Sequence, residues 1–120
     1  MRALHIERGK DGELLASSYL ARKGFEVELC NWRSGHHEID LIATKDGIIH
    51  FIEVKTRHTT TYGFPKESVN RKKFESLKKA ATAFLSRFRD VKKIQFDILS
   101  ILILPGRDIE FFLVEDVYID

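Results

Sequence analysis

The stretch that decides the fold runs from Glu38 to Arg57 and reads EIDLIATKDGIIHFIEVKTR. Two apolar runs flank an Asp-Gly turn, a pattern that predicts a β-hairpin. Asp40, Glu53 and Lys55 interrupt these runs at positions that face inward. A buried charge costs several kcal/mol unless it is compensated, and a divalent cation would compensate two carboxylates. The hairpin therefore predicts a metal site with a lysine beside it.

The spacing of these three residues predicts that they converge. Glu53 and Lys55 are two residues apart on one strand, so their side chains leave the same face with Cα atoms roughly 6.6 Å apart, at ~3.3 Å per residue. The turn folds the strand of Asp40 back alongside and supplies the second carboxylate. A few oxygen ligands completed by water and a phosphate suit Mg²⁺ or Mn²⁺. We expect Asp40 and Glu53 to bind the metal and Lys55 to orient the attacking water or stabilise negative charge.

The rest of the chain predicts the order αβββαββ. Helices are expected over residues 9–23 and 70–88, strands over 25–31, 94–104 and 109–114 in addition to the hairpin, and loops over 32–37 and 58–65. The return from the third strand through a helix allows a parallel crossover. We therefore expect an α/β fold with a mixed central sheet of about five strands flanked by helices.

Composition sets the class of protein. A chain of 120 residues with 43% hydrophobic content has the size of one domain, which we expect to span residues 1–120. The single cysteine, Cys30, excludes an internal disulfide framework and fits a reducing compartment, where we expect it to be an inert packing residue. The sequence contains neither a membrane-span pattern nor a signal-peptide pattern. We expect a cytoplasmic protein that does not associate with membranes.

Charge is distributed unevenly along the chain. Residues 71–93 contain nine Lys and Arg residues and two acids, whereas residues 94–120 contain one Arg and six acids. This asymmetry favours one basic face that lies along phosphates, and a charged helix with a solvated outer face is the alternative. The residues expected to position phosphates are Arg33, Arg57, Lys72 and Lys73.

At these positions the chain resembles the PD-(D/E)XK nuclease superfamily, in which an Asp is followed across a hairpin by Glu-x-Lys and preceded by a Glu on the first helix. More narrowly, it resembles the UPF0102 (YraN-like) family of small bacterial proteins. Its helix and Glu-x-Lys pattern is also similar to archaeal Holliday junction resolvases. The narrower resemblance covers most of the chain. The residues that carry it are Gly9 to Glu13, Ala16, Leu20, Gly24, Phe25, Asn31, Arg33, Glu38 to Ile42, Phe51 to Arg57, Gly63, Pro65, Val69, Lys72 or Lys73, and Phe96 with Asp97.

The resemblance implies a restriction endonuclease-like fold and an Mg²⁺-dependent endonuclease that hydrolyses DNA phosphodiesters, including branched or flapped DNA, through metal-activated water. Asp40, Glu53, Lys55 and Glu13 would be its catalytic residues, with Glu13 holding a metal-bound water or a second ion. A non-catalytic module that binds nucleic acid or a protein partner on the same fold is the alternative function.

Several residues keep two interpretations. Glu38 shares a face with Asp40, so it either supports the metal site or is an exposed acid at the start of a strand. Asp97 is either a structural hydrogen-bonding residue or a site residue. His36 and His37 are expected to contact solvent or phosphate rather than zinc. The last strands either form a homodimer contact or close the sheet edge within one monomer.

Overall fold

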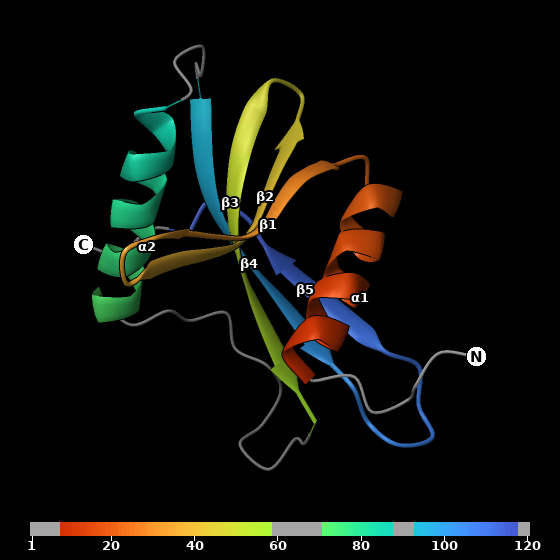
Figure 1. Ribbon diagram of the computed structural model, residues 1–120. Helices are drawn as coiled ribbons and strands as arrows, with labels where there is room; N and C mark the ends of the chain where they lie inside the picture. Colours follow the sequence, from red (N-terminus) through yellow and green to blue (C-terminus); the bar gives the residue numbers. More distant parts are fainter. Residues whose placement is uncertain (1–7, 59–70, 88–92, 118–120) are drawn as a thin grey trace.

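The computed structural model describes residues 8–58, 71–87 and 93–117, and Figure 1 shows their arrangement. The elements are α1 (Arg8–Arg22), β1 (Glu26–Ser34), β2 (His37–Lys45), β3 (Ile48–Arg57), α2 (Arg71–Leu85), β4 (Lys93–Leu102) and β5 (Glu110–Val114). The predicted order αβββαββ is confirmed. No helix among these residues is long and apolar enough to cross a lipid bilayer.

The five strands form one mixed sheet in the order β1-β2-β3-β4-β5. All neighbouring strands are antiparallel except β3 and β4, which run parallel because α2 lies in the connection between them. The parallel pairing keeps one register from Ile48 opposite Lys93 to Arg57 opposite Leu102. The face on which each β3 side chain lies is therefore fixed along the whole strand.

The two helices cover opposite faces of this sheet (Figure 1), and each face has its own apolar core. On the α2 face the buried residues are Ile39, Ile42, Phe51, Phe74, Leu77, Ala80, Ala81, Phe84 and Ile98. On the α1 face they are Ala16, Leu20, Phe25, Leu41, Ala43, Ile52, Leu99 and Ile101. Phe51 and Ile52 are adjacent on β3 and enter different cores, as strand alternation requires. By the same alternation Glu53 and Lys55 lie on the α2 face.

The predicted loop over residues 32–37 is wrong. β1 continues to Ser34 and β2 begins at His37, so that only Gly35 and His36 form the turn. Trp32 packs edge-on against Phe84 of α2, and this contact extends the hairpin beyond the length that its polar composition indicates. Gly35 has a φ of 61°, which a tight turn requires and glycine adopts at little cost.

The predicted alternation of the first strand is also interrupted. The register between β1 and β2 shifts between Val27 and Leu29, and beyond the shift Leu29 and Cys30 are both exposed. A bulge adds a residue to one strand and changes the faces of the residues that follow it. The expectation that Cys30 is a packing residue is therefore wrong. Residues 59–65 of the second predicted loop lie outside the described residues. So do Asn70 and Phe88, the two ends of the second predicted helix.

The packing of α1 depends on a close approach to β3. A Cβ atom at Gly12 would lie 2.4 Å from Thr56 Oγ1 and 3.7 Å from Thr56 Cβ, so a side chain does not fit without movement. At its other end α1 stops at Gly24, which has a φ of 93°. There the Phe25 N–H donates to the Leu20 carbonyl and the Gly24 N–H donates to the Ala21 carbonyl. Together these features fix the helix that carries Glu13.

Gly12→Ala is expected to lower the free energy of unfolding by about 1–3 kcal/mol, because the new methyl group overlaps Thr56 Oγ1. In a Thr56→Ala background the hydroxyl is absent, and the same change should be neutral or stabilising by up to ~1 kcal/mol, since alanine favours a helix over glycine. A double-mutant cycle measured by urea unfolding tests this. Equal effects of Gly12→Ala in both backgrounds would show that the overlap is not the cause.

Candidate functional site

Asp40 and Glu53 face each other across the central hairpin. Leu41 pairs with Ile52 at the last position of the β2–β3 ladder, which leaves Asp40 opposite Glu53. The backbone N–H of Val54 donates a hydrogen bond of 2.8 Å to Asp40 Oδ2 and fixes the carboxylate. Glu53 is only 7% exposed. Two acids therefore lie on one half-buried surface, next to the α2 core.

The electrostatics of this pair are unfavourable when both acids are ionised. Burial, followed by the charge of Glu53, raises the pKa of Asp40 from 3.8 to about 7. The charge of Glu38 also contributes to this increase, while the hydrogen bond from the Val54 N–H and the charge of Lys73 reduce it. A bound cation would relieve both the desolvation of the carboxylates and their repulsion.

Lys73 on the first turn of α2 supplies positive charge to this surface. Its Nζ lies 3.3 Å from Glu53 Oε1. From the sequence, Lys73 was expected to contact phosphates, and the structure brings it to the carboxylates. A signal was present in the spacing, because Lys73 stands four residues before the buried Leu77 and therefore lies beside the apolar stripe of α2.

Lys55 lies on the same face of the sheet as Glu53. β3 is paired with β4 in one register through both residues, so no bulge changes the direction of either side chain. Lys55 is half-buried. The geometric condition for its predicted role, a shared face with Glu53, is met.

Glu13 lies on α1, which covers the face of the sheet opposite to α2, and its described contact is with β1. The side-chain amide of Asn31 donates a hydrogen bond of 2.8 Å to Glu13 Oε1. Cys30 pairs with Leu41 and Trp32 pairs with Ile39, so Asn31 stands opposite Asp40. Asn31 has a φ of 54°, a conformation that asparagine adopts more readily than most residues. The sequence resemblance includes Asn31 but gives it no role, because its position opposite Asp40 depends on the register of β1.

The other residues predicted to belong to the site differ in their contacts and exposure. Glu38 forms an ion pair of 3.2 Å with Arg33, and its charge reaches Asp40, so the first interpretation of Glu38 is favoured. Arg57 is exposed and donates to the Thr56 carbonyl from Nη1 at 3.3 Å. Lys72 is exposed at the start of α2.

Comparison with known proteins shows which family this constellation belongs to. The pattern described as "Uncharacterised protein family UPF0102" matches residues 12–101, which include every proposed site residue. The chain belongs to the UPF0102 family. A UPF0102 protein of Syntrophomonas wolfei is 43% identical over 105 residues, covering 87% of this chain and 91% of that protein. A UPF0102 protein of Chloroherpeton thalassium is 38% identical over 122 residues, covering 95% of each.

Among solved structures, one that resembles this UPF0102 chain is that of Hjc, a Holliday junction resolvase from the archaeal hyperthermophile Archaeoglobus fulgidus. The TM-score is 0.42 and the sequence identity 22%, over 83% of this chain and 71% of that chain.

A second group of polar residues on the UPF0102 chain has a structural explanation. Ligand atoms of His50, Asp97 and Glu115 lie within 4.8 Å of one another. The carboxylate of Asp97, 1% exposed, already bonds to His50 Nδ1, accepts from Gln95 Nε2 at 3.0 Å, and accepts from the Asp116 N–H at 3.0 Å. These bonds join β3, β4 and the segment after β5. The contacts favour the structural interpretation of Asp97.

Asp40→Asn is expected to raise the free energy of unfolding in metal-free buffer at pH 8, and to raise it less at pH 5. Wild-type stability falls as pH rises from about 4 to about 7, because the unfolded chain ionises Asp40 in that range while the folded chain keeps the proton. Asparagine has no charge and still accepts from the Val54 N–H. Urea unfolding in EDTA measures the difference.

Asp46→Asn in the exposed β2–β3 turn is the matched control for this substitution. It should stay within about 0.5 kcal/mol of wild type at both pH values, as surface changes usually do. A stability gap between Asp40→Asn and wild type that narrows from pH 5 to pH 8 would contradict the raised pKa of Asp40.

Proposed function

We propose that this UPF0102 protein is an Mg²⁺-dependent endonuclease that hydrolyses phosphodiester bonds of DNA, with branched and flapped forms among its substrates. The observation that carries the proposal is the pairing of Asp40 with Glu53 on one half-buried face, where Asp40 keeps its proton up to about pH 7. Such strongly perturbed acids are typical of functional sites. Lys55 lies on the same face and is the third residue of the proposed catalytic group, with Asp40 and Glu53.

The residues fit a hard divalent cation. The carboxylates of Asp40 and Glu53 would hold it, and oxygen donors of this kind are those that Mg²⁺ and Mn²⁺ prefer. The charge of Glu53 acts on Asp40 and raises its pKa, and a bound cation would relieve this repulsion between the two carboxylates. When bound, the cation would polarise the scissile phosphate and make a water molecule more acidic.

The protein's own side chains would orient the attacking water, stabilise negative charge and position the phosphates. The Lys55 ammonium would orient the attacking water or stabilise the charge that develops on the phosphate oxygens. The Val54 N–H holds Asp40 in one orientation, so the carboxylate needs little rearrangement. Asn31 donates a hydrogen bond to Glu13, and in this proposal Glu13 would bind a water molecule or a second ion. Arg33, Arg57, Lys72 and Lys73 would position phosphates.

Asp40→Asn, Glu53→Gln and Lys55→Ala are each expected to lower the rate of DNA cleavage by roughly 100-fold or more, because each removes a metal ligand or the ammonium. DNA affinity measured in EDTA should be retained. The assay uses linear, flapped and four-way DNA substrates with Mg²⁺ or Mn²⁺. Glu26→Gln on the exposed edge of β1 is the control. If all three variants cleave as fast as this control, the assignment is wrong.

Metal affinity is expected to rise between pH 6 and pH 8. Asp40 must lose its proton to bind the ion, so below its pKa of about 7 the affinity for Mn²⁺ should fall by up to about tenfold per pH unit. Isothermal titration calorimetry with Mn²⁺ at pH 6, 7 and 8 measures this, and Asp40→Asn should abolish the pH dependence together with most of the binding. Affinity that is flat across this range would exclude Asp40 as the titrating ligand.

A non-catalytic module that binds nucleic acid or a protein partner remains the second candidate function. The observation that favours it is the ion pair between Lys73 and Glu53, since an ammonium 3.3 Å from Glu53 Oε1 offsets part of the charge of that carboxylate. This alternative predicts no Mn²⁺ binding at either carboxylate, so the calorimetric experiment also separates the two functions.

A further inference from the structure

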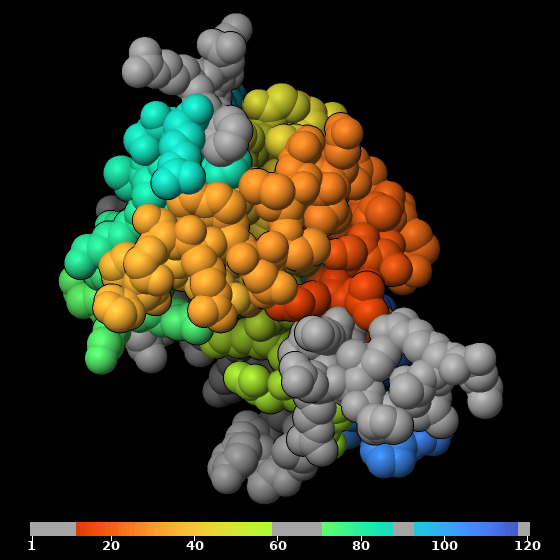
Figure 2. Space-filling view, in the orientation of Figure 1, coloured from red at the N-terminus to blue at the C-terminus, as the bar shows by residue number. Residues whose placement is uncertain are grey.

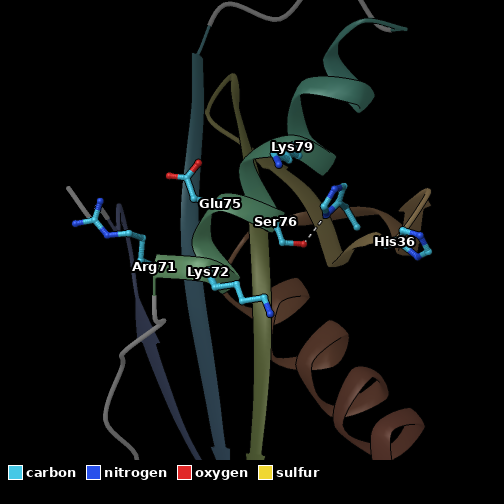
Figure 3. Close-up of a pocket in the computed structure, with 7 residues that line it drawn as sticks. His36, Arg71, Lys72, Glu75, Ser76 and Lys79 are labelled. Carbon is cyan, nitrogen blue, oxygen red and sulfur yellow. Dashed lines mark hydrogen bonds between the residues drawn. The ribbon is translucent and has the colours of Figure 1, made fainter.

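A groove outside the carboxylate site runs between the start of α2 and the turn that joins β1 to β2. Its volume is about 710 Å³. Figure 2 shows the hairpin tip and α2 side by side on one edge of the molecule, and the close-up in Figure 3 shows the groove between them. A hydrogen bond of 2.7 Å between His37 Nδ1 and Ser76 Oγ joins the two sides.

Three of the seven residues that line the groove are basic: Arg71, Lys72 and Lys79. Lys72, Ser76 and Lys79 are spaced four and three residues apart, so they form one stripe along α2. Figure 3 shows this stripe on the side of the helix toward His36, while Arg71 and Glu75 project away from the turn. Glu75, the acid that borders the groove, forms an ion pair of 3.2 Å with Lys78. Its charge is therefore largely compensated within α2.

The described start of α2 adds basic charge beside the groove. Residues 71–73 are all basic, and Arg71 and Lys72 are among the residues that line the groove. These side chains favour an anionic ligand at this end of the groove.

The groove and the carboxylate site share the described start of α2. Lys72 lines the groove, and the next residue, Lys73, contacts Glu53. The stripe from Lys72 to Lys79 is roughly 10 Å long at ~1.5 Å per residue, about three nucleotides of axial advance along one strand of a duplex.

We infer that this groove binds the sugar-phosphate backbone of the nucleic-acid strand that the carboxylate site acts on. The inference rests on the proposed function for the identity of the strand. Lys72 and Lys79 neutralise its phosphates, and the two histidines with Ser76 offer hydrogen-bonding groups. These contacts fix the position of the backbone and carry no base recognition.

The test is a fluorescence anisotropy titration of a labelled 30-nucleotide duplex in EDTA, over a range of salt concentrations. Lys72→Ala/Lys79→Ala is expected to weaken binding at least about tenfold at 0.1 M salt, and to reduce the slope of log K against log salt by about 1.8. Both lysines are at least partly exposed, so folding should be unaffected, and a thermal melt checks this. His37→Ala should weaken binding less, because it removes no phosphate-neutralising lysine.

Arg22→Ala/Lys93→Ala is the matched control, because it removes the same amount of charge at exposed positions elsewhere. Lys93 lies opposite Ile48 at the start of β3, and Arg22 is the last residue of α1. An equal loss of affinity and slope in both double variants would overturn the groove assignment. Binding of inorganic phosphate that the groove variant loses, while its DNA binding matches the control, would identify an adventitious ion only and would also overturn it.

The groove and the proposed function fail in different ways. If the groove variant binds DNA like the control and the wild type still cleaves DNA, the groove assignment is wrong and the nuclease assignment stands. If the groove variant loses DNA binding while the wild type cleaves no substrate, the groove assignment stands and the nuclease assignment is wrong. A wild-type protein that binds no DNA would contradict both.

Discussion

The uninterrupted parallel pairing of β3 with β4 is the constraint on which the rest of the structure depends. Ten consecutive residue pairs share one register, so every β3 side chain has a fixed face. Phe51 and Ile52 are thereby committed to separate cores, and Glu53 and Lys55 to a common surface. A one-residue slip would exchange these faces and place two charges in the α1 core. The core and the candidate site are therefore specified by the same pairing.

The two carboxylates of the candidate site repel each other when both are ionised, and the nearby positive charge of Lys73 reduces the cost of this repulsion. Asp40 holds a proton well above the ordinary range of an aspartate, and Glu53 is paired with Lys73 on α2. Glu53 is buried, whereas the Lys73 side chain is exposed, so water screens part of their attraction. The charge of Lys73 also lowers the pKa of Asp40, so α2 acts on both carboxylates. A cation or a phosphate that enters the site would act on both.

The sequence was sufficient for the features that depend on short-range periodicity. Glu53 and Lys55 share a face because strands have a period of two, and the Asp-Gly turn was enough to bring Asp40 beside them. The features that could not be predicted from the sequence depend on how elements far apart in the chain pack together. Lys73 reaches Glu53 only because α2 crosses the sheet at one particular angle, and Asn31 stands opposite Asp40 only because β1 carries a bulge. The turn at Gly35 and His36 was mistaken for a longer loop because the contact between Trp32 and Phe84 has no local signal.

The hydrogen bond from Val54 to Asp40 makes one residue serve both architecture and chemistry. The β2–β3 ladder ends at Leu41, and the next acceptor for a main-chain amide is a carboxylate oxygen instead of a carbonyl. Beyond that point β2 is free to leave β3 and turn toward α2, where His37 meets Ser76. Any residue that replaces Asp40 must therefore supply a side-chain acceptor to keep this end of the hairpin closed. Asparagine retains such an acceptor, and alanine does not.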